Sequence, residues 1–140
     1  MNEGVLRAYY SDKNDRETTI MFGVGDWWIT DMYSFLNQQP ALMNLEALEN
    51  SEVLELSKAD LDKLYVEVPK FERFFRIIIQ NAYVREQVRV IHNLSMTAEE
   101  RYEVFMQKYP HIAQRVTQKQ IASYLGITPE FLSSIRARKS

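Results

Sequence analysis

The sequence predicts a mixed α+β fold in which short strands precede a long helix and a terminal pair of short helices. Three observations lead to this prediction. Strand-like runs are confined to residues 4–56, apolar residues recur every three or four positions over residues 70–94, and two short capped helical patterns flank a glycine near the end. The predicted parts are residues 1–68, which carry the strands, residues 69–94 and residues 95–140.

Composition restricts the class of protein. The 140 residues are 46% hydrophobic, enough for one compact domain or two small ones, and the net charge of −2 argues against coating nucleic acid by bulk charge. Charge is uneven: residues 113–140 hold five basic residues and one acidic residue, a net +4, which leaves −6 for residues 1–112. An acidic body with a basic end is typical of a modular regulator, although a solvated basic end of an ordinary domain looks the same.

Cysteine is absent, which excludes disulfides, thiolate metal sites and cysteine-ligated iron–sulfur clusters. The two histidines, His92 and His111, suggest no haem or metal set, so we expect no cofactor and no metal. No apolar run reaches about 18 residues and the start lacks a signal-peptide pattern. We therefore expect a soluble, cytoplasmic protein.

Four strands are expected in two pairs. "VLRAYY" and "ETTIMF" are separated by the polar turn cluster "SDKNDR", and "ALMNLEAL" and "EVLEL" are joined by "ENS". The segment between the pairs begins with glycines, ends in a proline and allows a short central helix. Closely spaced short strands suggest a sandwich or barrel, but four are few for closing one.

Two helices follow the strands. Ser57 is an N-cap with Asp60 at N3, which predicts a helix over residues 58–68, and Pro69 separates it from a helix over 70–94. One set of positions on the long helix is spaced by 3, 4, 3, 4 and 3 residues, a heptad seam that favours a dimer: Phe74, Ile77, Asn81, Val84, Val88 and Ile91. A second stripe lies beside it: Phe71, Phe75, Ile78 and Ala82. The alternative is one wide face buried within a monomer, with Asn81 at its edge.

The last part is a run of capped helices. Thr97 with Glu100 at N3 predicts a helix over residues 97–109, which Pro110 ends. Further on, Thr117 caps a helix over residues 118–125. The next residue, Gly126, supplies the positive φ of a tight turn, and a second helix follows, capped by Thr128 with Pro129 at N1.

The spacing within this pair matches a helix-turn-helix. Ala122, a small residue, lies four before Gly126, and Leu132 and Ile135 lie six and nine after it. Ile121, Leu125 and Ile127 complete a miniature core. We therefore expect DNA binding, with a purely structural helical hairpin as the alternative. If the second helix enters the major groove, its outward residues read bases: Pro129, Glu130, Ser133, Ser134 and Arg136. Others are better placed for phosphates: Arg115, Thr117, Gln118, Lys119, Arg138 and Lys139.

The order of these parts resembles the Crp/Fnr family of bacterial transcription regulators. The stretches that look like its Bacteroidetes-type members are "EGVLRAYY", "GDWWITDMYSFL", "VPKFERFFRIIIQNA", "LSMTAEERYEVFMQKYP" and "RVTQKQIASYLGITPEFLSSIR". The resemblance implies a partial jelly-roll, cyclic-nucleotide-binding-like effector domain (1–68), a dimerisation helix (69–94) and a winged-helix-like DNA-binding domain (95–140). It also implies a homodimer whose recognition helices read a two-fold symmetric operator, and recruitment of RNA polymerase.

Single residues carry over from the family pattern, and others depart from it. Glu130 matches the recognition-helix glutamate. Gln118, Ala122 and Gly126 match the framework. Ser134 falls where cyclic-nucleotide-responsive members carry a base-reading arginine, which implies a different operator. Family members also have additional N-terminal residues that form the first strands of the roll, so the chain is expected to lack the start of that domain.

The ligand-binding cassette of the family is altered here. No arginine or lysine lies between Arg16 and Lys58, so an anionic cyclic phosphate would have no charged partner, and cyclic AMP is not expected as effector. Residues 25–35 are rich in aromatic side chains, which suggests either core packing or a pocket for an apolar or aromatic small molecule. The residues expected to line such a pocket are Gly25, Asp26, Trp27, Trp28, Tyr33 and Phe35. An alternative overall function is a truncated interaction module that pairs with full-length relatives without binding DNA. No enzyme is expected, because the sequence shows no nucleophile with a base, no P-loop and no metal set, and the paired carboxylates Glu99 and Glu100 lie in an ordinary first helical turn.

Overall fold

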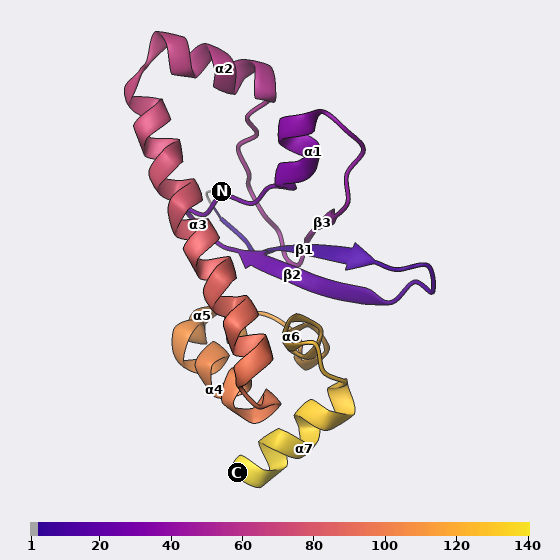
Figure 1. Ribbon diagram of the computed structural model, residues 1–140. Helices are drawn as coiled ribbons and strands as arrows, with labels where there is room; N and C mark the ends of the chain where they lie inside the picture. The colour runs from indigo at the N-terminus through magenta and orange to yellow at the C-terminus, as the bar shows by residue number, and fades with distance from the viewer. Residues whose placement is uncertain (1–2) are drawn as a thin grey trace. The chain divides into compact units, whose positions relative to one another are not determined.

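A computed structural model describes residues 3–140 (Figure 1). Within this range the chain forms three strands and seven helices, which confirms the mixed fold. The chain divides into two compact units. Unit 1 joins Met1–Leu54 to Ala98–Ser140, and unit 2 is Glu55–Thr97.

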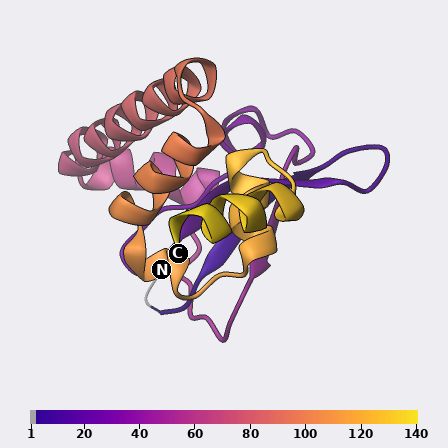
Figure 2. The same cartoon turned by 90° about the horizontal axis from the view of Figure 1, so that it is seen from below.

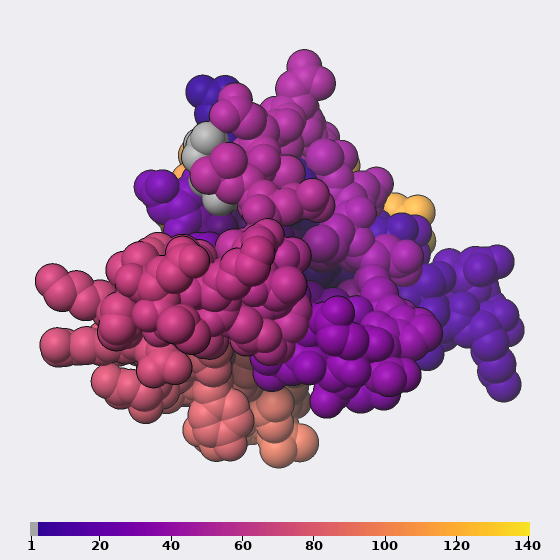
Figure 3. Space-filling model, turned by 90° about the horizontal axis from the view of Figure 1, so that it is seen from above, coloured from indigo at the N-terminus to yellow at the C-terminus, as the bar shows by residue number. Residues whose placement is uncertain are grey.

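Unit 1 contains a small antiparallel sheet in the order β2-β1-β3. Its strands are β1 (Leu6–Ser11), β2 (Glu17–Gly23) and β3 (Asn44–Ala47). The register between β1 and β2 shifts after Ala8, which marks a β-bulge. The turn joining these strands is held by the Asp12 carboxylate, and Figure 3 shows this turn, in blue-violet, projecting beyond its neighbours.

The prediction of a fourth strand at "EVLEL" was wrong. The backbone of Glu52 pairs with that of Glu3 in an isolated bridge, with no further pairing in the described residues on either side. The physical reason is that a strand must pair with a neighbouring strand over several residues. The partner of Glu52 is Glu3, which lies before the start of β1 and so offers no continuous strand. Between β2 and β3 the expected short helix is present as α1 (Met32–Asn37).

A buried arginine ties the three strands together. Arg7, on the central strand, is 6% exposed and reaches a carboxylate on each neighbour, Glu17 at 2.5 Å and Glu46 at 2.8 Å. Its guanidinium also lies 4.2 Å from the centre of the Tyr9 ring. These contacts compensate the desolvation of the charge, which would otherwise destabilise the sheet.

The remaining helices of unit 1 are α4 (Ala98–Lys108), α5 (Pro110–Ala113), α6 (Gln118–Leu125) and α7 (Pro129–Lys139). The predicted helix over residues 97–109 therefore exists, and Pro110 does more than end it. Proline has no N–H to donate and a φ suited to a first helical position, so Pro110 opens the short α5. Residues 98–140 form helices and turns without a strand.

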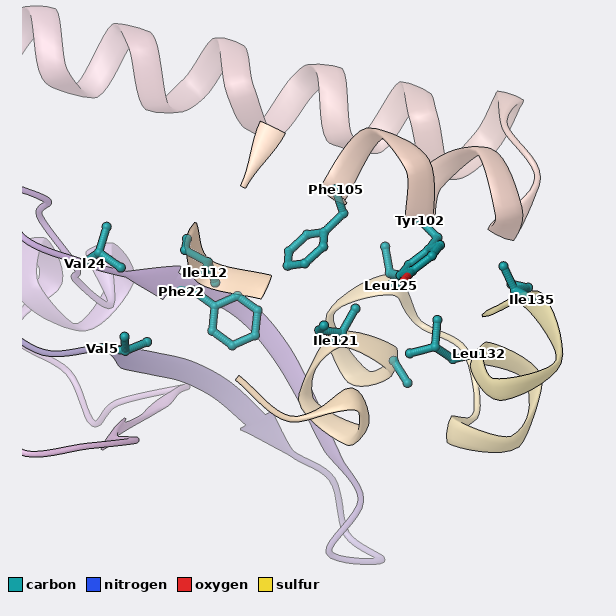
Figure 4. Close-up of a cluster of buried hydrophobic side chains, with 11 residues drawn as sticks. Val5, Phe22, Val24, Tyr102, Phe105, Ile112, Ile121, Leu125, Leu132 and Ile135 are labelled. Carbon is teal, nitrogen blue, oxygen red and sulfur yellow. The ribbon is translucent and has the colours of Figure 1, made fainter. Parts of the chain in front are cut away.

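One hydrophobic core joins the sheet to these helices (Figure 4). The ring of Phe22, on β2, lies 6.3 Å from that of Phe105 on α4 and 5.6 Å from that of Tyr124 on α6. The buried side chains around it come from both sequence segments of the unit: Val5, Val24, Tyr102, Ile112, Ile121, Ala122, Leu125, Leu132 and Ile135. Residues far apart in the sequence are thus held in one body.

Unit 2 consists of α2 (Lys58–Glu67) and α3 (Lys70–Ser95), within one residue of the predicted bounds. Ser57 caps α2 by accepting a hydrogen bond from the backbone N–H of Asp60 at 3.0 Å, as its sequence position predicts. The buried Phe75 on α3 packs edge-on against Tyr65 on α2, with ring centres 6.1 Å apart. Among the described residues, no helix combines the length and apolar character that crossing a membrane requires.

Candidate nucleic-acid interface

Local hydrogen bonds define both ends of α6. Thr117 and Gln120 form a capping box, in which the Thr117 hydroxyl accepts from the Gln120 N–H at 3.2 Å and the Gln120 side chain accepts from the Thr117 N–H at 2.9 Å. At the other end Gly126 adopts φ 70°, and the N–H of Ile127 donates to the Ala122 carbonyl at 3.0 Å. This i to i+5 bond is typical of a Schellman motif, which ends the helix and turns the chain.

The second helix of the pair begins at once. Thr128 caps α7 by accepting from the Phe131 N–H at 3.1 Å, and Pro129 occupies the first helical position. Ala122, Leu132 and Ile135 have no exposed surface, so the two helices cross closely around the small residue. The helix-turn-helix geometry predicted from the spacing is confirmed.

The outward face of α7 is polar and uncovered within unit 1. At about 100° per residue, Glu130 and Ser134 lie on the side opposite the buried Leu132 and Ile135. Figure 2 shows α7, in yellow, uncovered on the side facing the viewer. All five predicted base-reading residues are exposed: Pro129, Glu130, Ser133, Ser134 and Arg136.

The six predicted phosphate-contacting residues fall into two groups. Thr117, Gln118 and Lys119 gather at the first turn of α6, with Arg115 two residues before the cap. Thr117 already serves as the cap, and the half-buried Gln118 has a side-chain oxygen that accepts no hydrogen bond within residues 3–140. The other group, in the last turn of α7, is Arg138 and Lys139.

Carboxylates of unit 1 pair with three of these cations. Arg138 lies 3.9 Å from Glu99 on α4, and Lys139 contacts both Glu99 and Glu103. The hydrogen bond to Glu103 is the main influence on Lys139 and raises its pKa above the ordinary value. Arg115 pairs with Glu49, in the segment that follows β3.

Two structural contacts at this motif carry no sequence signal. Arg101, on α4, donates to the Leu125 carbonyl at the end of α6 at 2.5 Å, where a cation also suits the helix dipole. Ser123, on the side of α6, bonds to β2: its hydroxyl accepts from Thr19 and donates to the Glu17 carbonyl at 3.1 Å. Sequence patterns report neighbours within one helix, and both partners here are distant along the chain.

The predicted effector-pocket residues occupy different environments. Trp27 packs against the core of unit 1, with its ring 6.0 Å from that of Tyr109 in an edge-on contact. Trp28 and Tyr33 are exposed over 43% and 50% of their surface. Gly25 and Phe35 are partly buried and Asp26 is exposed. The packing of Trp27 is that of a core residue, and an effector role for this set stays a prediction.

Asp31 organises the segment around α1. Its carboxylate accepts from the backbone N–H groups of Ser34, Leu42 and Met43, at 3.1, 2.6 and 2.9 Å. Burial raises the pKa of Asp31, but these hydrogen bonds outweigh it and hold the pKa below the ordinary value of 3.8. In residues 3–140, no group of three or more His, Cys, Asp or Glu side chains is arranged to hold a metal ion.

The predicted seam on α3 is an exposed apolar stripe. Its six positions fall within about 100° of the helix circumference. The five apolar members are 39–58% exposed: Phe74, Ile77, Val84, Val88 and Ile91. Asn81 is also exposed, so the side chains of this stripe have surface available for a partner.

Sequence comparison identifies no relative: no protein-family model matches the chain, and no curated protein matches it. Comparison of structures identifies similar proteins. A transcriptional regulator of the Crp/Fnr family from Eubacterium rectale matches 98% of this chain with a TM-score of 0.74 and 13% identity. FixK2 from Bradyrhizobium japonicum matches 97% with a TM-score of 0.76 and 18% identity.

A third neighbour is CLP from Xanthomonas campestris, described as a c-di-GMP-responsive global regulator, with a TM-score of 0.73 and 16% identity over 97% of this chain. The matches cover 66%, 70% and 73% of the three neighbours, so this chain spans about two thirds of their length. Nearly the whole chain aligns, including the sheet, α3 and the helix-turn-helix. The chain therefore has the fold of Crp/Fnr-family transcriptional regulators.

Proposed function

We propose that the protein is a sequence-specific DNA-binding transcription regulator of the Crp/Fnr type. The observation that carries the proposal is the helix-turn-helix of α6 and α7, with its capped first helix, buried Ala122 and exposed polar face. In such a motif the second helix lies in the major groove. Glu130 would accept a hydrogen bond from cytosine N4, and Arg136 would donate to guanine.

The proposed regulator is a homodimer paired through α3. Burying the exposed half of each of five apolar seam side chains is worth roughly 0.8–1.5 kcal/mol, so ten side chains contribute about 8–15 kcal/mol. Association costs about 4–15 kcal/mol in lost freedom. The two ranges overlap, so pairing through α3 would depend on protein concentration, and two copies of α7 would suit a two-fold symmetric operator.

Regulation in this proposal is allosteric. An effector bound near the sheet would change the spacing of the two recognition helices and so change DNA affinity. Cyclic AMP is not the proposed effector, because residues 17–57 provide no arginine or lysine for its phosphate. The regulator would act in the cytoplasm of a bacterium and would recruit RNA polymerase to the promoter.

DNA binding is tested with the purified chain and a pool of random duplexes. Repeated selection should enrich one two-fold symmetric sequence. With four cations per protomer contacting phosphates, log K should fall against log salt with a slope of up to roughly −7 for the dimer. Lys119→Gln should reduce that slope by about 2 and weaken all sequences alike. Lys63→Gln, on α2, is the matched control and should leave binding unchanged.

Pairing is tested by sedimentation across protein concentrations. Asn81→Leu places an apolar side chain in the seam and should shift the association state. Asn93→Leu makes the same change about 150° away around the helix and should not. A monomer at every concentration for the wild type and for Asn81→Leu would contradict the seam. Dimerisation without enrichment of any duplex would favour an interaction module over a DNA reader.

A further inference from the structure

Among the described residues, the ion pair of Arg115 with Glu49 is the one that joins a predicted phosphate-contacting residue to the segment after β3. The guanidinium uses two donors: Nη2 contacts one carboxylate oxygen, and Nε lies 3.4 Å from the other. This two-point geometry is the one in which arginine binds a phosphate. The carboxylate therefore occupies the donors that a DNA backbone would use.

The segment that carries Glu49 is held in place by backbone contacts. The Leu48 N–H donates to the Val5 carbonyl at 2.9 Å, just before Glu49. Two residues after Glu49, Ser51 packs closely against Gly4. A Cβ added at position 4 would lie 2.0 Å from the Ser51 hydroxyl oxygen. The Ser51 hydroxyl in turn donates to the Glu49 carbonyl at 2.8 Å. Glu49 is thus presented to Arg115 by an ordered segment and not by a loose side chain on a free loop.

The location of the pair matters for DNA binding. Arg115 lies two residues before the N-cap of α6, the end of the motif where backbone N–H groups and the helix dipole favour an anion. Lys119, in the first turn of α6, forms no ion pair within residues 3–140. The same holds for Arg136 on α7. The cations of the motif therefore differ in how readily a phosphate can reach them.

We propose that Glu49 is an internal competitor for the DNA backbone, holding Arg115 in the DNA-free protein and giving way to a phosphate on binding. The inference rests on the proposed DNA-binding function and adds a regulatory contact to it. A change at the sheet that moves the segment 48–52 would then alter DNA affinity through Arg115. Because both side chains are partly exposed, the effect is moderate, about 1.5- to 5-fold in affinity.

The test uses the full chain and a fluorescent random-sequence duplex of roughly 30 base pairs, about three helical turns. Glu49→Gln should bind about 1.5- to 5-fold more tightly, with a salt slope steeper by up to about 1 per protomer. In an Arg115→Gln background the same change should have no effect. Asp15→Asn is the charge-matched control, since Asp15 is exposed in the β1–β2 turn at φ 58°, which asparagine tolerates.

Glu49→Asp provides a second variant, because it keeps the charge but shortens the reach and should give part of the gain. Thermal unfolding confirms that each variant is folded. The inference is overturned if Glu49→Gln binds no more tightly than Asp15→Asn, or gains equally without Arg115. If no variant binds the duplex, the proposed function fails and the inference with it, whereas binding without a Glu49 effect removes the inference alone.

Discussion

The hydroxyl of Ser123 joins the helix-turn-helix to the sheet by hydrogen bonds. It accepts from the Thr19 N–H at 2.8 Å and from the Thr19 hydroxyl at 3.0 Å, and it donates to the Glu17 carbonyl at 3.1 Å. One donor and two acceptor positions of the serine are thereby used. Thr19 lies at the β-bulge and is fully buried, so water cannot easily replace the lost partner.

Ser123→Ala removes all three hydrogen bonds. At about 0.5–1.5 kcal/mol each, the free energy of unfolding should fall by roughly 1.5–4.5 kcal/mol. Domains of this size have about 5–15 kcal/mol in total, so the loss is a large fraction. With an m-value of about 2 kcal/mol/M, the urea midpoint should fall by about 0.7–2.3 M. Tryptophan fluorescence reports the transition, because Trp27 packs in the core of the same unit.

The control is Ser133→Ala, on the exposed face of α7, which should change stability by less than about 0.5 kcal/mol. The reasoning is refuted if Ser123→Ala shifts the urea midpoint no more than this control does. A double-mutant cycle with Thr19→Val gives a second check. The two changes share one contact, the hydrogen bond between the two hydroxyls, so the coupling energy should be about 0.5–1.5 kcal/mol, and simple additivity would contradict the geometry.

Three further predictions concern other parts of unit 1. Gly126→Ala should lower the free energy of unfolding in urea by about 1–2 kcal/mol. The cause is the φ of 70° alone, since no atom lies within 4 Å of the added Cβ. A loss near zero would contradict this prediction. The ionised Asp31 carboxyl should contribute its full stability to the fold above pH 3.8 and lose that contribution as the pH falls through its lowered folded-state pKa. The amide NMR signals of Ser34 and Leu42 should therefore titrate with a midpoint below 3.8. A higher midpoint would refute this prediction. Glu130→Ala should relax selection at one operator position by about 1–3 kcal/mol, and unchanged selection from random duplexes would remove Glu130 from the base readers.

Features that depend on neighbouring residues were predicted well from the sequence. The ends of α6 follow from a capping threonine and a glycine that alone tolerates positive φ cheaply, and Thr128 with Pro129 begins α7 for equally local reasons. The position of the exposed apolar stripe on one side of α3 follows from the helical period, and its use as a dimer seam stays a prediction. The capped helices and the spacing around Ala122 therefore predicted the helix-turn-helix before any tertiary contact was known.

Features that depend on distant partners were decided only by the tertiary structure. "EVLEL" has strand character but forms a single bridge at Glu52, because pairing requires a neighbouring strand that sequence propensity does not supply. Nothing in the sequence indicated that Ser123 would meet β2, or that Glu49 would hold Arg115. By itself the sequence determined the helix-turn-helix, since the hydrogen bonds that cap its helices join residues only a few positions apart. The fold determined how that motif is held, since those contacts join residues more than 60 positions apart.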